Sequence, residues 1–172
     1  MSKQKDKKTL KFTSVRNFQI FMKVAQQQIA QEFELATVQK LIHEAIPMAG
    51  QSKVELLEFS RGHVVMKMPI EGNTNHLNTM YAGALFTLAE LPGGAILMSA
   101  FDMSKFFPTL GKIETKFTAP AKTAVTVEVN LSEEELTRIG EEAKTQGKSV
   151  FVLELDLKDE NGVVVAQTKG TY

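Results

Sequence analysis

The residues best suited to chemistry lie in one short stretch, where a polar loop runs into an apolar segment. The loop contains Asn75 and Asn78, and the apolar segment, residues 83–101, carries a single carboxylate, Glu90. A carboxylate can act as a general base or a nucleophile. The first N–H groups of a helix have no partner within that helix, so they suit an oxygen that gains negative charge. This stretch is therefore the candidate reaction centre of the chain.

The spacing within this stretch argues for a site shared between two chains. If the apolar segment is a helix that begins near Ala82, Glu90 lies roughly 10–12 Å along its axis from the first N–H groups. That distance is too long for both to serve the same reacting atom. A symmetric second copy, with its helix antiparallel alongside, would bring its own Glu90 to these donors. We therefore expect at least a dimer, with residues 83–101 near the two-fold axis.

Simpler interpretations of the same residues stay open. Burying the charge of Glu90 among apolar residues costs free energy unless the carboxylate is paired, so Glu90 alternatively hydrogen-bonds the Asn75 loop and serves stability alone. Asn75 and Asn78 are also common turn residues. Three scattered histidines lack the spacing of a metal site, and we expect neither a metal nor a cofactor.

Composition narrows the class of protein. The 172 residues include twenty Lys plus Arg and twenty Asp plus Glu, so no net charge recruits nucleic acid or an anionic membrane. Cysteine is absent, which excludes disulfides and cysteine nucleophiles. The lysine-rich start of the chain has no apolar core typical of a secretory signal. Glu90, Pro92 and two glycines interrupt the longest apolar run, which disfavours a transmembrane helix. We expect a cytoplasmic protein.

The pattern of apolar residues predicts helix first and strands afterwards. Residues 1–11 carry no apolar pattern and are predicted to be a flexible tail, followed by an N-terminal helical extension at 12–35. Apolar residues recur at spacings of three and four through residues 18–46, and Pro47 and Gly50 are expected to end this helical pattern.

Six later runs are predicted to be strands. Two of them, 110–117 and 124–130, alternate between apolar and polar residues, and the other four form two pairs of strand-length runs joined by hairpin turns. Ser132 opens a capping box that predicts a helix ending at Gly147. The fold class is thus α+β, with a curved, mostly antiparallel sheet wrapped around one long central helix. In a single chain, one apolar face of that helix and one edge of the sheet would stay exposed to solvent. A second copy of the chain would cover them. The predicted strands are 54–59, 63–68, 110–117, 124–130, 149–157 and 163–171.

Three motifs, in this order, resemble a known family. The Asn75 loop leads to Tyr81-Ala82-Gly83 and then to Glu90, a Phe-x-x-Pro-Ala segment occupies residues 117–121, and a closing hairpin spans residues 161–166. Residues 36–172 are similar to the hotdog-fold acyl-CoA thioesterases of the phenylacetate-pathway type. Their signature is an Asn-containing loop, then His-Gly-Gly, then a carboxylate on the central helix.

The resemblance implies a hotdog domain over residues 36–172 that hydrolyses acyl-CoA or another acyl thioester as a homodimer or dimer of dimers. It implies that Glu90 is the general base or nucleophile and that Asn75 positions water or substrate. It also implies that the backbone N–H of Ala82 polarises the thioester carbonyl. Substrate contacts are implied for Gly83, Tyr81 and Asn78.

Two departures from the family pattern keep other functions open. Tyr81 stands where the family has His, and Ala82 replaces Gly, which keeps the N–H donor but makes a positive φ costly. A non-catalytic hotdog module that binds acyl-CoA or a partner is one alternative. A dehydratase or hydratase is a weaker one, because that chemistry pairs a His with a carboxylate. Lys112 and Lys116 either contact coenzyme A phosphates or, with Glu114, form a solvated strand face.

Overall fold

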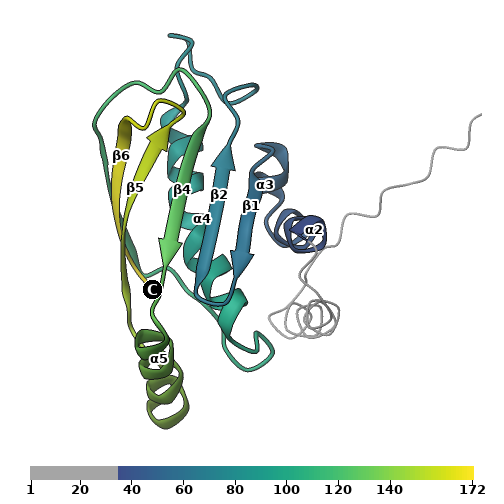
Figure 1. Cartoon of the computed structure of the whole chain (residues 1–172), viewed down its shortest axis with the longest axis vertical. Coiled ribbons are helices and arrows are strands. Elements are labelled where there is room, and N and C mark those ends of the chain that lie inside the picture. Colours follow the sequence, from purple (N-terminus) through teal and green to yellow (C-terminus); the bar gives the residue numbers. More distant parts are fainter. Residues whose placement is uncertain (1–34) are drawn as a thin grey trace, which may run out of the picture.

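The computed structural model describes residues 35–172, and Figure 1 shows them as one sheet curved around a long helix. The predicted tail, and all but the last residue of the predicted extension at 12–35, lie outside the described part, so this division of the chain stays a prediction. The described elements are α2 (Leu35–Ala45), α3 (Pro47–Gln51), β1 (Glu55–Ser60), β2 (His63–Met68), α4 (Ala82–Ala100), β3 (Lys112–Phe117), β4 (Val125–Asn130), α5 (Glu133–Gln146), β5 (Val152–Asp159) and β6 (Val164–Thr171).

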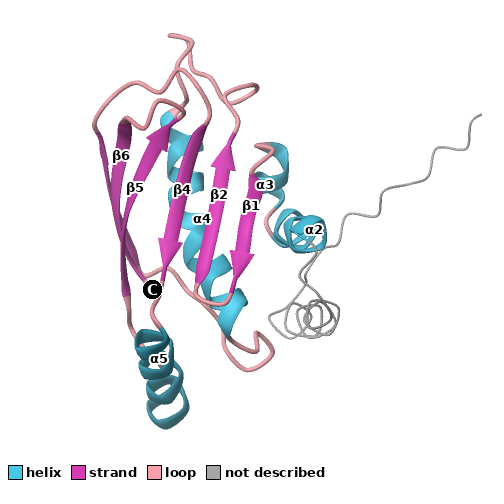
Figure 2. Cartoon of the chain, in the orientation of Figure 1, coloured by secondary structure: helices cyan, strands magenta, loops and turns pink. Residues whose placement is uncertain are grey.

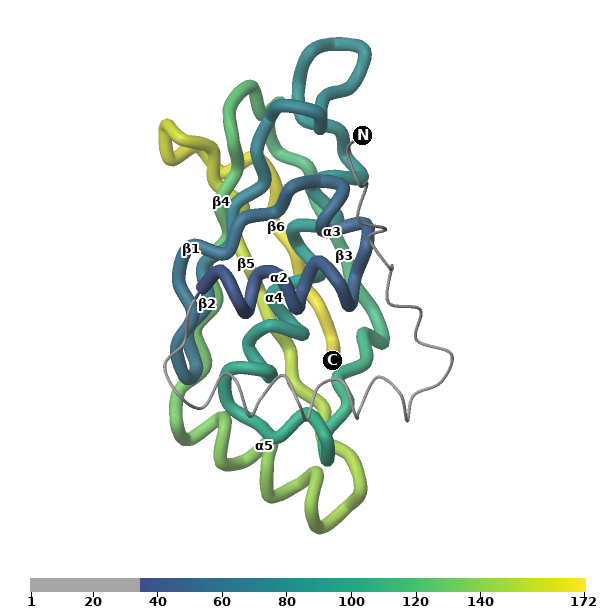
Figure 3. Tube along the Cα trace, turned by 90° about the vertical axis from the view of Figure 1, so that its right-hand side faces the viewer, coloured from purple at the N-terminus to yellow at the C-terminus, as the bar shows by residue number. Residues whose placement is uncertain are grey.

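The six strands form one antiparallel sheet, which confirms the predicted α+β architecture. Their order is β1-β2-β4-β5-β6-β3, so β1 and β3 lie at the two edges. In Figure 2 the strands form a single layer, and α4 crosses one face of it. Figure 3 shows β6 passing alongside α4, and the residue after this strand reaches the middle of the helix.

Helix α4 is the core of the fold, because the sheet covers most of its apolar surface. Leu88 and Ile96 are fully buried. The helix is long and apolar enough to cross a membrane, but 72% of its apolar window is buried within the fold, as in the core helix of a globular domain. Between residues 82 and 94, its uncovered residues form one stripe at helical spacing. This α4 stripe consists of Ala82, Gly83, Phe86, Thr87, Glu90 and Gly94.

The outer side of β3 and its neighbours is charged. Lys112, Glu114 and Lys116 alternate along β3 and are all exposed. Lys112 pairs with Glu114 at 3.1 Å, and Lys169 of β6 pairs with Glu154 of β5 at 2.6 Å. The interpretation of the β3 lysines as part of a solvated strand face agrees with the structure.

Two predicted boundaries need correction. Helix α2 ends at Ala45 as expected, but Pro47 begins the short helix α3, which contains Gly50, rather than ending helical structure. Proline suits the first position of a helix because the N–H it lacks would have no partner there. Strand β5 also lies later than predicted and runs to Asp159, whose side chain accepts the N–H groups of Asn161 and Val163 and thereby builds the turn.

The predicted helix after Ser132 is confirmed as α5. Ser132 Oγ accepts the N–H of Glu135 at 3.2 Å, and Gly147 ends the helix with a φ of +76°. Leu136 and Ile139 are buried against the rest of the fold. Helix α5 therefore packs at one end of the sheet (Figure 1).

Candidate active site

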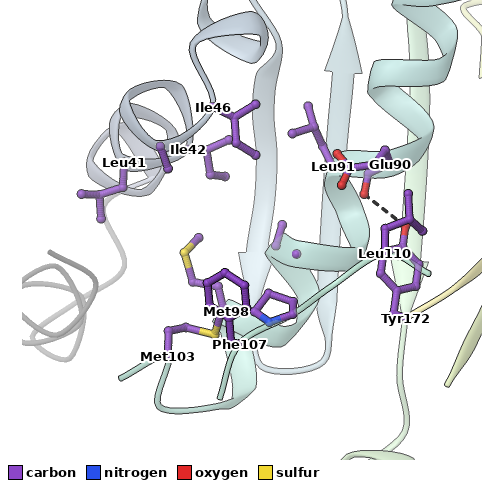
Figure 4. Close-up of a pocket in the computed structure, with 14 residues that line it drawn as sticks. Leu41, Ile42, Ile46, Glu90, Leu91, Met98, Met103, Phe107, Leu110 and Tyr172 are labelled. Carbon is purple, nitrogen blue, oxygen red and sulfur yellow. Dashed lines mark hydrogen bonds between the residues drawn. The ribbon is translucent and has the colours of Figure 1, made fainter. Parts of the chain in front are cut away.

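Glu90 lies in the α4 stripe and lines an apolar cavity of about 180 Å³ (Figure 4). The side chain is half-buried, and desolvation by this burial raises the pKa of its carboxyl group above the ordinary range. A carboxylate with a raised pKa is a stronger base, which suits it to take a proton from water near neutral pH.

The rest of this cavity is apolar apart from one hydroxyl. Helix α2, helix α4 and the connection from α4 to β3 supply most of its walls, and among the lining residues only Glu90 has a carboxylate side chain and none has a basic one. In Figure 4, Met98, Met103 and Phe107 gather at one side, while Glu90 and Tyr172 face each other at another. The cavity therefore has the composition of a site for an apolar group held next to a carboxylate.

Tyr172 is a cavity residue that the sequence analysis missed. Its hydroxyl donates a hydrogen bond of 3.1 Å to the backbone carbonyl of Glu90. It follows β6, far along the chain from Glu90, and no local pattern connects the two. Only the sheet order, which places β6 beside α4, brings them together.

Asn75 organises a tight loop just before α4. Its side-chain oxygen accepts the N–H groups of Leu77 at 2.8 Å and Thr79 at 3.3 Å, and its amide nitrogen donates to Thr79 Oγ1 at 3.0 Å. Asn78 is exposed, with a φ of +56°. Both asparagines are therefore turn residues in this chain. Within residues 35–172, Asn75 makes no hydrogen bond to Glu90, so the interpretation in which the same chain's loop holds Glu90 is wrong.

A second residue missed by the sequence analysis, Asn73, anchors this loop. It is buried, and its amide nitrogen donates to the carbonyls of Ser52 and Pro69 at 2.8 and 2.9 Å. Its own carbonyl accepts the N–H of Tyr81 at 2.8 Å. The sequence shows only an Asn-rich loop, and burial alone distinguishes Asn73 from its exposed neighbours.

The first turn of α4 presents open backbone donors. The N–H groups of Ala82 and Gly83 have no hydrogen-bond partner among the described residues, as is usual for the first turn of a helix. Neither residue has a positive φ, so the alanine in place of glycine leaves the turn unstrained. Tyr81 is the N-cap, in an extended conformation, and its exposed ring packs where a Cβ on Gly83 would collide with it.

A second hollow, of about 430 Å³, lies at this end of α4. Asn75, Ala82 and the Phe-x-x-Pro-Ala segment at 117–121 all line it, so two predicted site residues meet the second predicted motif here. The N–H of Met80 donates to the Ala121 carbonyl at 2.8 Å and ties the loop to that segment. Glu90 lines the other cavity and not this hollow. A single chain therefore keeps the carboxylate apart from the predicted donors.

Comparison with known proteins assigns a family. The family model described as "Putative thioesterase (yiiD_Cterm)" matches residues 35–172. A crystal structure from Pseudomonas aeruginosa, of a protein of unknown function called a "Probable Thioesterase", is 41% identical in sequence. The match covers 77% of this chain and 89% of that chain, with a TM-score of 0.74.

Two more distant structures share the fold. One is a thioesterase, called "putative", from Shewanella oneidensis, at 23% identity and a TM-score of 0.66, covering 80% of this chain and 94% of that one. The other is zebrafish thioesterase superfamily member 2, at 22% identity and a TM-score of 0.59, covering 80% and 95%. These likenesses confirm the predicted hotdog fold. The chain belongs to the thioesterase family that the yiiD C-terminal model defines.

Proposed function

We propose that this protein hydrolyses an acyl thioester, with acyl-CoA as the first candidate, at a site shared between two copies of the chain. The observation that carries the proposal is that Glu90 and the open N–H groups lie on one stripe of one helix but in different hollows. One hollow contains the carboxylate but not the N–H donors, and the other contains the donors but not the carboxylate. In a dimer, the Glu90 hollow of one copy can lie against the donor hollow of the other without a change in the structure of either chain.

The helix geometry supports this arrangement. Ala82 and Glu90 are eight residues apart, which is about 12 Å along the helix axis, too far for one substrate carbonyl. Two α4 helices packed antiparallel along their stripes, with the two-fold axis beside Phe86, bring Glu90 of one copy to Ala82 of the other. Phe86 is 42% exposed in the single chain, so this packing would bury a large apolar side chain.

The free edge of the sheet supports the same partner. Strand β3 is an edge strand, and the hydroxyl of Thr115 is buried with no hydrogen-bond partner within residues 35–172. Antiparallel pairing of two β3 strands with Thr115 opposite Thr115 gives these two hydroxyls each other as partners. It also places Lys116 opposite Glu114 of the second copy, a favourable cross-strand pair.

The chemistry follows from these groups. Glu90 accepts a proton from water, and the water oxygen attacks the thioester carbonyl carbon. The Ala82 N–H, with that of Gly83 beside it, stabilises the carbonyl oxygen as it gains negative charge. The carbon–sulfur bond then breaks, and the leaving thiolate takes the proton held by Glu90. A carboxylic acid and a thiol are the products. The acyl group occupies the apolar cavity beside Glu90.

The test is a hydrolysis screen of the purified chain against short, medium, long and aromatic acyl-CoA thioesters, with release of the thiol as the readout. At least one substrate should turn over, and light scattering at micromolar concentration should give a dimer or larger. A fully active monomer would contradict the shared site. Binding of acyl-CoA with no hydrolysis of any thioester would instead favour the non-catalytic module.

A further inference from the structure

The turn of α4 that carries Glu90 is poorly supported by its own helix. Pro92 has no N–H to donate to the Leu88 carbonyl one turn earlier, and Gly93 and Gly94 are weak helix formers. A catalytic carboxylate needs a fixed position, because small displacements lower turnover. A contact from outside the helix therefore helps to hold this turn.

Tyr172 supplies such a contact, and it is itself held in place by the sheet. Its N–H donates to the Phe151 carbonyl at 3.0 Å, and its carbonyl accepts the Phe151 N–H at 3.1 Å, which extends the β5–β6 ladder by one pair. The two rings stack with centroids 5.4 Å apart and planes 16° from parallel. Backbone and ring of Tyr172 are thus both fixed to the sheet.

Two glycines make room for the Tyr172 ring. A Cβ on Gly93 would collide with the ring, and a Cβ on Gly170 would lie 2.7 Å from its Cε2 atom. Gly94 differs, since a Cβ there would meet nothing within 4 Å. The glycine at 93, unfavourable inside a helix, is therefore explained by the space that Tyr172 occupies.

We infer that Tyr172 is a positioning residue for Glu90, through the hydrogen bond of 3.1 Å from its hydroxyl to the Glu90 carbonyl. This inference rests on the proposed catalytic role of Glu90. The hydroxyl bridges the sheet and the one turn of α4 whose own ladder Pro92 interrupts. Burial, together with the nearby charge of Glu90, raises the pKa of Tyr172. The hydroxyl therefore stays protonated and able to donate at neutral pH.

The test uses Tyr172→Phe, which keeps the ring, its stacking on Phe151 and its position beside Gly93 and Gly170, but removes the hydroxyl. We expect kcat to fall about tenfold while KM stays within about twofold, the loss expected for one misplaced catalytic group. Ser99→Ala is the matched control, because Ser99 is buried and its hydroxyl also donates to an α4 carbonyl, that of Ile96 at 2.7 Å, but away from Glu90 and Tyr172. It should lower the melting temperature at least as much as Tyr172→Phe does, with kcat nearly unchanged at 25 °C. A lower melting temperature with wild-type kcat in Tyr172→Phe would reduce Tyr172 to a structural residue.

A double variant separates this inference from the proposed function. If Tyr172 acts through Glu90, adding Tyr172→Phe to Glu90→Gln should cost no further activity, because the group it positions is already disabled. A further tenfold loss would show that Tyr172 acts elsewhere and would overturn the inference. If Glu90→Gln is inactive while Tyr172→Phe is fully active, the inference fails and the proposed function stands. Full activity in Glu90→Gln would overturn both.

Gly93→Ala tests the hydrogen bond between the Tyr172 hydroxyl and the Glu90 carbonyl independently. The added Cβ must displace the Tyr172 ring, so the hydroxyl should lose the Glu90 carbonyl and kcat should fall at least as far as in Tyr172→Phe. Wild-type kcat in a folded Gly93→Ala protein would contradict the inference even if Tyr172→Phe could not be purified.

Discussion

The two hollows along α4 are both lined mainly by apolar residues, but they offer a substrate different polar groups. The cavity beside Glu90 contains one carboxylate side chain, whose pKa is raised by burial. The hollow at the helix start contains Asn75 and Ala82 but no carboxylate, and its polar groups are backbone groups, the Asn75 amide and the Thr118 hydroxyl. One hollow thus suits an acyl chain and a base, and the other suits a developing oxyanion.

The departures from the family pattern affect these two hollows differently. The donors at the helix start are backbone N–H groups, so Ala82 in place of glycine and Tyr81 in place of histidine leave them available. The cavity beside Glu90 depends on a side chain instead, and no neighbouring carboxylate lines it as a substitute. Side-chain substitutions should therefore cost far more at Glu90 than at the helix start.

Glu90→Gln should have the largest effect. The amide keeps the size and hydrogen-bonding capacity of the side chain but cannot accept a proton from water. Turnover should fall at least a hundredfold, within the usual range for a general base, while binding of a non-hydrolysable acyl-CoA analogue changes little. Steady-state kinetics and calorimetry on one preparation measure both quantities. Wild-type turnover would end the catalytic assignment.

Ala82→Pro should have the next largest effect. Proline removes the N–H donor, and it fits the first position of α4 because Tyr81 before it is already extended, with φ −65° and ψ 137°. We expect turnover to fall by about a hundredfold or somewhat less, since the Gly83 N–H remains. Ala82→Ser, which retains the N–H, is the matched control and should stay within a few-fold of wild type. Equal activity of the two variants would mean that the N–H plays no part.

The smallest expected effect is on stability and depends on pH. The raised pKa of Glu90 means that the folded chain holds this proton more tightly than the unfolded chain does. The associated stability is present below the ordinary glutamate pKa of about 4.3 and is lost as pH rises through the raised pKa. Glu90→Gln should therefore melt about 1–3 °C above wild type at pH 7. The difference should shrink towards zero near pH 4, and a difference independent of pH would show that desolvation is not its cause.

Much of the fold could be predicted from the sequence because its signals are local. Alternation and hairpin turns predicted the strands, the capping box at Ser132 predicted α5, and the long apolar run predicted α4. Turn chemistry was harder: Pro47 begins a helix rather than ending one, and the side chain of Asp159 moves the end of β5. In both cases the same residues are compatible with either conformation, so the local sequence does not decide between them.

The candidate site could be predicted only in part. Asn75, Ala82 and Glu90 lie in one continuous stretch, so the position of Asn75 before the helix and the separation of Ala82 and Glu90 along it could be worked out in advance. Tyr172 and Asn73 could not be found this way. Tyr172 reaches Glu90 through the strand order, and Asn73 differs from its neighbours only in being buried. Tertiary placement, and not residue type, gives these two residues their roles.

The most direct test of the shared site is to mix two inactive variants, Glu90→Gln and Ala82→Pro, after unfolding and refolding them together. In a mixed dimer, one site carries both defects, whereas the other combines an intact Glu90 with an intact Ala82 from the opposite copy. Random pairing of equal amounts should therefore restore about a quarter of wild-type activity, because half of the dimers are mixed and each has one good site. If each chain instead carried its own complete site, the mixture would be no more active than the average of the two variants, and the account would be wrong.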